Sequence, residues 1–405
     1  MAKKKKPEIR FKGFTDDWEQ RKLRDVAENF EYGLNVAAKE FDGVKKYIRI
    51  TDIDDESRQF KQDDLTSPDT DLEIADRYKL EKGDILFART GASVGKSFIY
   101  RDSDGLVYYA GFLIRGKIKP NFDIEFIFQN TLTRNYENYI RITSQRSGQP
   151  GVNAQEYQEF TLRVPICEEQ KKIGAFLYNL DHLITLHQRK CEKLKNMKKA
   201  MLEKLFPKNG SNIPEVRFRG FTDDWEQREA KDIFKTIVDK GYPNLTVLSA
   251  SQEYGMIKRI EMGINIYHNL QNEMGYKRVQ PGQFVIHLRS FQGGFAHSEI
   301  EGITSPAYTV FSFQEQEKHY DYFWKYIFNS EVFIKRLELI TYGIRDGRSI
   351  SFEDFSTLSF YFPNYEEQRQ IGYFFQKLDH LITLHQRQLE KLKNVKKSML
   401  EKMFV

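Results

Sequence analysis

Residues 168–206 read EEQKKIGAFLYNLDHLITLHQRKCEKLKNMKKAMLEKLF, and residues 366–404 read EEQRQIGYFFQKLDHLITLHQRQLEKLKNVKKSMLEKMF, with 28 of 39 positions identical. Apolar residues recur in both stretches at alternating steps of four and three, which is the spacing of a coiled-coil seam. Neither stretch contains proline, and each is long enough for a helix of about 55–60 Å. We therefore expect two long helices that pack along this seam. The seam residues are Ile173, Leu177, Leu180, Ile184, His187, Leu194, Ile371, Phe375, Leu378, Ile382, His385 and Leu392.

A shorter repeat opens each half of the chain. Residues 7–21 read PEIRFKGFTDDWEQR and residues 214–228 read PEVRFRGFTDDWEQR, identical at 13 of 15 positions. The segments between the repeats barely resemble each other, which indicates one scaffold carrying two different surfaces. The predicted order is a repeat block at 1–21, a variable domain at 22–165, a long helix at 166–206, a linker with the second repeat block at 207–228, a second variable domain at 229–363 and a second long helix at 364–405.

Each variable segment is typical of a mixed α/β domain. Short apolar runs predict strands at 46–50, 84–88, 97–100, 111–114, 283–288 and 308–313. Longer periodic stretches predict one helix at 123–139 and another at 320–339. Two similar halves pack most simply about a pseudo-twofold axis, which would set the long helices antiparallel. The expected fold is two α/β (α+β) domains in a pseudo-twofold arrangement, joined by two long antiparallel coiled-coil helices.

Composition excludes some classes of protein and leaves others open. The chain has 405 residues with 32 Phe and 22 Tyr, so each half can bury a core, and its formal net charge of +5 is compatible with nucleic-acid binding without indicating it. The two cysteines, Cys167 and Cys191, favour a reducing cytoplasm over a disulfide framework. No apolar run approaches the roughly 18 residues of a membrane span. We therefore expect a cytoplasmic protein without membrane contact.

No motif indicates catalysis or metal binding. Residues 90–97 read TGASVGKS, in which only three residues separate the first glycine from the Gly-Lys pair, so the stretch favours a tight turn over a phosphate loop. His182 and His187 recur as His380 and His385, but a spacing of five does not stack two metal ligands on one helical face. We expect no catalytic residue, no metal and no cofactor bound by this chain.

The order of these motifs carries a family resemblance. Each variable segment is followed by E-E-Q-x-x-I-G and a D-H-L-I-T-L-H-Q-R helix, and the FTDDWE openings, the GDILFARTG stretch at 83–91 and the HLRSFQGG stretch at 287–294 accompany them. In this combination the chain resembles the specificity subunit of type I restriction–modification enzymes. The resemblance implies that each variable segment is a target recognition domain that reads one half of a bipartite DNA sequence.

The resemblance also implies partners. The long helices would set the gap between the two half-sites and dock two methyltransferase subunits, which bind S-adenosylmethionine. Separate restriction subunits would translocate and cleave double-stranded DNA with ATP and Mg²⁺. This chain would supply specificity without activity of its own, and because its two variable segments differ, the target would be asymmetric.

Polar side chains in loops are the candidates for DNA contact, because Arg, Gln, Asn and Ser pair with base edges. Residues 143–152 and 342–350 are rich in Gly and Arg, as groove-facing loops are. The candidate DNA-binding residues are Arg89, Ser93, Lys96, Arg146, Ser147, Gln149, Asn153, Arg289, Ser290, Gln292, Arg345 and Arg348.

Two other interpretations stay open. The chain could be a non-catalytic scaffold whose two divergent heads bind proteins, which weak salt dependence and no DNA sequence preference would indicate. A dispersed nuclease site would instead be revealed by Mg²⁺-dependent cleavage by the purified chain alone.

Overall fold

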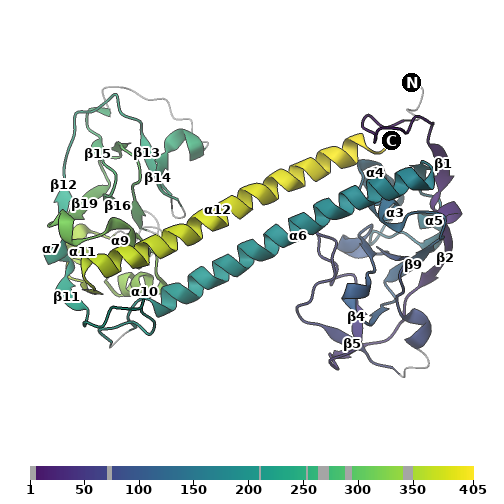
Figure 1. The fold of residues 1–405 in the computed structure, drawn as a ribbon, viewed down its shortest axis with the longest axis horizontal. Helices are drawn as coiled ribbons and strands as arrows, with labels where there is room; N and C mark the ends of the chain where they lie inside the picture. The colour runs from purple at the N-terminus through teal and green to yellow at the C-terminus, as the bar shows by residue number, and fades with distance from the viewer. Residues whose placement is uncertain are drawn as a thin grey trace. The chain divides into compact units, whose positions relative to one another are not determined.

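The computed structural model describes residues 6–70, 75–208, 211–251, 254–262, 273–287, 294–340 and 350–405. The chain divides into two compact units, Met1–Arg189 with Gln386–Val405 and Lys190–His385, which we call unit 1 and unit 2. Each unit contains one variable segment and parts of both long helices (Figure 1).

The long repeated stretches form the two long helices that their spacing predicts. Helix α6 spans Cys167–Lys204 and helix α12 spans Tyr365–Lys402, with 38 residues in each. In unit 1, Ile173 near the start of α6 shares a core with Met403, just beyond the end of α12. In unit 2, Leu194 in the last part of α6 packs on a core that contains Phe375 of α12. The two helices are therefore antiparallel within each unit.

One carboxylate in each unit joins both long helices to the variable segment. In unit 1, Asp181 of α6 accepts a hydrogen bond from the Gln129 amide at 2.8 Å and pairs with Lys396 of α12 at 2.5 Å. Unit 2 repeats this joint at 2.7 and 2.6 Å with the equivalent residues Asp379, Tyr326 and Lys198. The repeated aspartate thus sets the same helix register in both units.

A four-stranded antiparallel sheet forms the centre of each variable segment. In unit 1 its order is β2 (Ala27–Tyr32), β9 (Leu113–Ile118), β6 (Asp84–Ala88) and β7 (Ser97–Ile99). In unit 2 its order is β12 (Phe234–Ile237), β19 (Thr309–Phe313), β16 (Phe284–Ile286) and β17 (Phe295–His297). The strand predicted at 84–88 is confirmed residue for residue. The strand predicted at 111–114 is wrong at its start, because Leu113 N–H donates to Ala110 C=O at 2.8 Å and closes a turn there.

Shorter elements surround these sheets. In unit 1 they are β1 (Glu19–Lys22), α1 (Leu23–Val26), β3 (Ala38–Glu40), β4 (Lys46–Ile48), β5 (Thr66–Pro68), η1 (Asp76–Tyr78), η2 (Gly91–Ser93), η3 (Asp102–Asp104), β8 (Val107–Tyr109), α5 (Ala154–Gln158) and β10 (Thr161–Val164). In unit 2 they are β11 (Glu226–Glu229), α7 (Ala230–Ile233), β13 (Leu248–Ser251), β14 (Gly255–Lys258), η4 (Arg259–Met262), β15 (Lys277–Val279), β18 (Gly302–Thr304), η5 (Gln316–Lys318), α11 (Phe352–Ser356) and β20 (Ser359–Phe362).

The two helices predicted in the variable segments are each broken in two. The stretch 123–139 forms α3 (Ile124–Asn130) and α4 (Arg134–Thr143), and the stretch 320–339 forms α9 (Asp321–Phe328) and α10 (Glu331–Ile340). A hydroxyl starts the second helix each time, because Thr133 accepts from Tyr136 N–H at 3.4 Å and Ser330 accepts from Phe333 N–H at 3.2 Å. The expectation of a single helix was therefore wrong in both segments, since side-chain capping ends the run that apolar periodicity suggests.

The short repeat blocks fasten each variable segment to its long helix. In unit 1, Arg10 donates two hydrogen bonds to the buried carboxylate of Glu169, at 2.8 and 2.6 Å. Arg217 and Glu367 make the same bidentate pair in unit 2, at 2.9 and 2.6 Å. The repeated tryptophan is buried in both units, and Trp18 packs edge-on against Phe126 at 5.6 Å. These contacts explain physically why the blocks recur.

Both cysteines are free thiols. Cys191 is buried, with its Sγ 4.0 Å from the Ile382 carbonyl oxygen, and Cys167 is partly buried. A buried free cysteine acts as a small apolar residue.

Candidate nucleic-acid interface

Three strands of the unit 1 sheet end at one edge, where they bring together residues far apart in the sequence. Arg89 follows β6, and its N–H donates to the carbonyl of Phe112, which directly precedes β9, at 3.0 Å. Tyr32 ends β2 and pairs with Ile114 of β9. On the other side of Arg89, its carbonyl accepts from Val152 N–H at 2.9 Å, which attaches the loop 145–152. We call Tyr32, Arg89, Phe112 and Gln149 the unit 1 rim.

The glycine-rich turn after β6 is packed into the rim. Gly91 and Gly95 have φ angles of 69° and 84°, which favour glycine. The Tyr157 hydroxyl donates to Ala88 C=O at 2.6 Å and accepts from Gly95 N–H at 3.2 Å, so it holds both ends of the turn. Burial raises the pKa of Tyr157, so its hydroxyl remains a donor at neutral pH. A Cβ on Gly91 would lie 2.9 Å from Gln149 Nε2, which shows how closely the two loops approach.

Among the described candidates, Arg89 is the one whose charge is least compensated. Its guanidinium lies over the Tyr32 ring, 4.9 Å from the ring centroid. Among the described residues it has no ion-pair partner, whereas Lys96 pairs with Asp55 and Arg146 pairs with Glu156. An arginine held against an aromatic face keeps its hydrogen-bond donors pointing outward for a ligand.

The other predicted residues of the first half divide between an exposed loop and local structural roles. Ser147 and Gln149 are exposed in the loop that flanks Arg89. Ser93 is buried in the turn. Arg146 also donates to the carbonyls of Thr143 and Gln145, and Asn153 caps α5 by accepting from Glu156 N–H at 2.9 Å. Within the described contacts, Arg89, Ser147 and Gln149 thus retain polar groups without a local partner.

The candidates of the second half lie outside the described residues. They are Arg289, Ser290, Gln292, Arg345 and Arg348. The described part of the corresponding sheet edge contains Val238, which follows β12 and is 70% exposed, and Tyr308, which precedes β19. The His287 ring lies 6.0 Å from the Tyr308 ring there.

Two aromatic residues of the rim were missed from the sequence. Phe112 is 58% exposed and Tyr32 is 44% exposed. Neither belongs to a polar loop, so a search for Arg, Gln, Asn and Ser passes over both. The Ala-Gly-Phe turn at 110–112 was the available signal, because an aromatic residue at a turn tip is poorly placed for burial.

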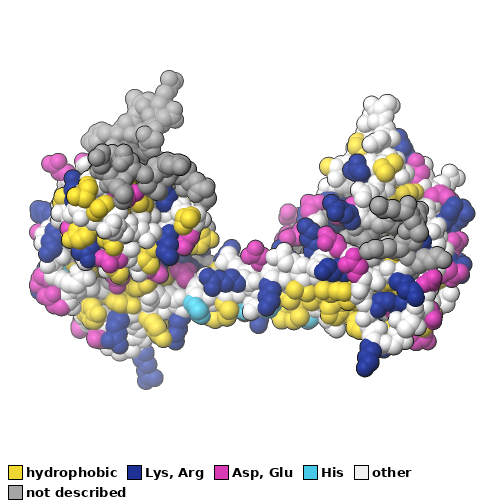
Figure 2. Space-filling view, turned by 90° about the horizontal axis from the view of Figure 1, so that it is seen from above, with side chains coloured by type: hydrophobic (Ala, Val, Ile, Leu, Met, Phe, Trp, Pro, Cys, Tyr) yellow, Lys and Arg dark blue, Asp and Glu magenta, His cyan; other side chains and the backbone are white. Residues whose placement is uncertain are grey.

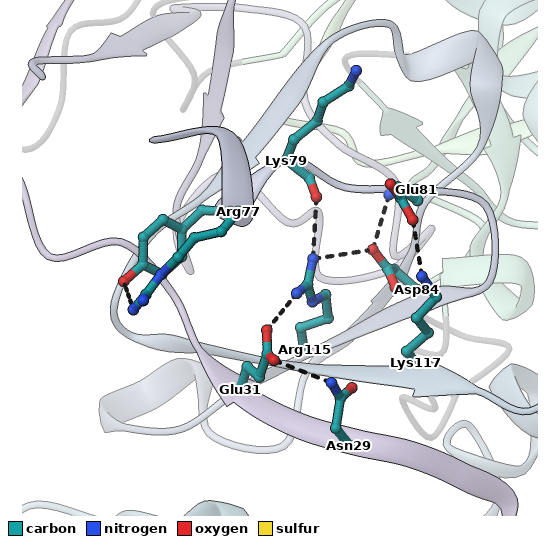
Figure 3. Close-up of polar contacts among 9 residues, drawn as sticks. Asn29, Glu31, Arg77, Lys79, Glu81, Asp84, Arg115 and Lys117 are labelled. Carbon is teal, nitrogen blue, oxygen red and sulfur yellow. Dashed lines mark hydrogen bonds and ion pairs between the residues drawn. The ribbon is translucent and has the colours of Figure 1, made fainter. Parts of the chain in front are cut away.

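A second polar cluster on the same sheet consists of charges that pair with one another (Figure 3). Arg115 of β9 pairs with Glu31 of β2, donates to Lys79 C=O at 3.1 Å and lies 3.7 Å from Asp84. Lys117 pairs with Glu81 at 2.9 Å. Asp84 is fully buried, and burial raises the pKa of its carboxyl. These charges compensate one another across the sheet. Arg89, in contrast, has no ion-pair partner among the described residues.

The predicted seam residues differ in burial along each helix. Ile173, Leu177, Leu180, Ile184, Ile371, Phe375, Leu378 and Ile382 are buried, whereas His187, Leu194, His385 and Leu392 are partly buried. Leu392 packs on the unit 1 core and Leu194 on the unit 2 core.

Neither a metal-ligand cluster nor a membrane-spanning helix occurs in the part of the chain that the structure describes. No group of three or more His, Cys, Asp or Glu side chains is placed to hold an ion there. No helix among the same residues is both long and apolar enough to cross a membrane.

Comparisons with known proteins agree on one family. A type I restriction enzyme specificity subunit of Methanocaldococcus jannaschii, MjaX, is 23% identical over 401 residues, covering 95% of this chain and 92% of the relative. The MjaVIII specificity subunit of the same organism is 22% identical over 79% of this chain and 78% of its own length. The crystal structure of the S subunit of a type I restriction–modification system from M. genitalium matches with a TM-score of 0.65 over 99% of both chains, at 12% identity, which establishes the shared fold. Residues 15–196 and 222–394 match the type I restriction modification DNA specificity domain, and the chain therefore belongs to that family.

Proposed function

We propose that this chain is the DNA-reading subunit of a type I restriction–modification complex and carries out no chemical step itself. Each variable segment contacts one half of a bipartite target in double-stranded DNA. Because the two segments differ in sequence, their half-sites differ and the target is asymmetric. Family membership and the two-unit fold support this proposal.

The observation that carries the proposal is the Arg89 guanidinium at the unit 1 rim. It lies on the Tyr32 ring without an anionic partner among the described residues. A guanidinium pairs in two-pronged fashion with guanine O6 and N7 in the major groove, or with a phosphate. The exposed amide of Gln149 beside it can pair with adenine in the same way. We assign Arg289, Ser290, Gln292, Arg345 and Arg348 the same task in the second half.

The long helices are proposed to set the separation of the two reading segments and to dock methyltransferase subunits. Leu183 and Leu186 of α6 are 41% and 39% exposed, and their repeats in α12, Leu381 and Leu384, are 40% and 43% exposed. Figure 2 shows hydrophobic side chains among charged ones along the long helices. Apolar side chains repeated at the same place in both helices suit a partner that binds twice. The partners, and not this chain, would bind S-adenosylmethionine, ATP and Mg²⁺.

The test is to co-express the chain with its methyltransferase subunit and to map methylated adenines across the host genome by long-read sequencing. We expect one split motif with two unlike halves. The variant Arg89→Ala should lose or relax one half of the motif. The matched variant Arg21→Ala should leave the motif intact, because its exposed guanidinium pairs with Glu19 on β1, which pairs with β10 and does not belong to the sheet that carries the rim.

A stable complex that methylates no defined motif would contradict the proposal. In that case, binding of the complex to a random DNA duplex at rising salt would distinguish the alternatives. Little salt dependence would favour a protein-binding scaffold, because phosphate contacts make DNA binding strongly dependent on salt.

A further inference from the structure

The unit 1 rim presents an apolar side chain that the core does not use. Phe112 is 58% exposed at the third position of a tight turn, Ala110 to Leu113, between β8 and β9. Single exposed apolar residues are common on protein surfaces and need no explanation alone. Phe112 differs because its backbone is hydrogen-bonded to Arg89, the rim cation that has no ion-pair partner among the described residues.

The turn that carries Phe112 is held rigidly against the end of β2. Gly33 N–H donates to Leu113 C=O at 3.0 Å, and Leu34 N–H donates to Tyr109 C=O at 2.9 Å. A Cβ on Gly33 would lie 2.2 Å from the Ala110 carbonyl oxygen, so the two backbones are in direct contact. A side chain on such a support loses little further conformational entropy when it binds.

Phe112 and Arg89 bring an apolar group and a hydrogen-bonding fork to directly bonded backbone positions of the rim. Arg89 N–H to Phe112 C=O, at 3.0 Å, keeps the two residues adjacent whatever their side chains do. The DNA major groove offers the complementary pair of features, because guanine presents O6 and N7 while thymine presents its C5-methyl group. The corresponding edge of unit 2 also exposes an apolar side chain, Val238 at 70%.

We propose that Phe112 is a specificity-determining residue that contacts the C5-methyl group of a thymine in the half-site read by unit 1. This inference rests on the proposed function, because it assumes that the rim faces DNA. It adds a residue that hydrogen-bonding chemistry does not reveal and a chemical group on the DNA that it recognises.

The test uses the complete complex with its methyltransferase and a duplex that carries the mapped target. Each thymine of both half-sites is replaced in turn by deoxyuridine, which lacks only the methyl group, and dissociation constants are measured for the wild type and for Phe112→Ala. One replacement, in one half-site, should weaken wild-type binding about fourfold, as loss of one buried methyl group does. The same replacement should leave Phe112→Ala unchanged, because the partner of the methyl group is already gone.

Val44→Ala is the matched control. Val44 is 62% exposed and precedes β4, whose parallel pairing with β8 places it at the end of β8 away from Phe112. The Val44→Ala complex should bind the mapped target and each deoxyuridine duplex as the wild-type complex does. Specific binding by Phe112→Ala with an undiminished response to every deoxyuridine would overturn the methyl contact and leave the proposed function standing. Absence of sequence-specific binding by the wild-type complex would instead overturn the proposed function.

Discussion

At the scale of single residues, the two units share the hydrogen bonds that attach the long helix to the variable segment. They differ in the side chains next to those bonds. Gln170 accepts from Asp123 N–H at 3.1 Å, and Gln368 accepts from Tyr320 N–H at 3.0 Å. The residue before each bonded amide differs, being Phe122 in unit 1 and His319 in unit 2. The equivalent sequence position holds an aromatic ring in both units, but only the His319 ring can bind a proton.

His319 should make unit 2 sensitive to acid. Its ring is buried among Phe313, Trp324 and Phe362, with centroids 5.1, 5.6 and 5.1 Å away. Burial lowers the pKa of His319 from 6.5 to about 4. Between these values the unfolded chain binds a proton that the folded unit does not, so stability falls as pH falls through this window. We expect a loss on the order of 1 kcal/mol at pH 5.5, measured by urea unfolding followed through tryptophan fluorescence.

The variant His319→Phe, which copies unit 1, should remove this part of the pH dependence. Unfolding midpoints compared at pH 7.5 and 5.5 would then differ less in the variant than in the wild type. An equal loss of stability on acidification in both proteins would mean that other titratable groups cause it. Because two units need not unfold together, each transition in the curve is analysed separately.

The rim shows which candidate DNA-contacting residues could be predicted from residue type alone. Arg89 and Gln149 were predicted from their side-chain chemistry, since Arg and Gln recognise base edges. Phe112 and Tyr32 were not, because their exposure depends on where β2, β6 and β9 end relative to one another. That arrangement follows from strand pairing across more than 80 residues of sequence, which no local pattern contains.

At the scale of elements, each unit contains a very close contact between a long helix and the start of a helix of the variable segment. Gly174 of α6 faces the start of α3, where a Cβ would lie 2.3 Å from Asp123 Oδ1 and 2.9 Å from the Phe126 backbone nitrogen. Asp123 caps α3 by accepting from Phe126 N–H at 2.8 Å. Gly372 meets Tyr320 and Phe323 of unit 2 in the same way. The glycine of the repeated I-G pair is therefore required for this approach.

Gly174→Ala should destabilise unit 1 by about 1–3 kcal/mol, the usual effect of overpacking. Intrinsic helix preference acts in the opposite direction, since alanine favours a helix over glycine by about 1 kcal/mol. The measurement is the shift in the urea midpoint of unit 1. Gly148→Ala serves as the control, because no atom lies within 4 Å of its added Cβ and it should unfold as the wild type does. A Gly174→Ala variant more stable than the wild type would show that α3 and α6 can move apart at little cost in free energy.

The same scale explains which parts of the fold were predictable. The long helices were, because ten turns of apolar spacing and the absence of proline leave no competing structure. The helices predicted at 123–139 and 320–339 were not, because Thr133 and Ser330 start new helices within the apolar run. A threonine or serine inside an apolar helical pattern can either continue the helix or cap a new one, depending on the backbone around it. Periodicity alone therefore could not predict this break.

At the scale of the whole molecule, both long helices are shared between the units. Unit 1 contains α6 up to Arg189 and α12 from Gln386, and unit 2 contains the remaining part of each. The aspartate–lysine pair that sets helix register occurs inside each unit, between Asp181 and Lys396 and between Asp379 and Lys198. The unit boundaries lie between Arg189 and Lys190 in α6 and between His385 and Gln386 in α12. Residues can therefore be inserted there without altering either aspartate–lysine pair.

Seven residues inserted at both boundaries should lengthen the gap between the two half-sites and leave the half-sites themselves unchanged. Seven residues keep the heptad phase and add about 10 Å of helix. At about 3.4 Å per base pair this corresponds to about three base pairs. Methylation mapping of the co-expressed complex should return the same two half-sites with the longer gap. An insertion in α6 alone is the control, since it leaves the two helices unequal and should abolish methylation. Retention of the original gap by the double insertion would show that the helices do not set the spacing.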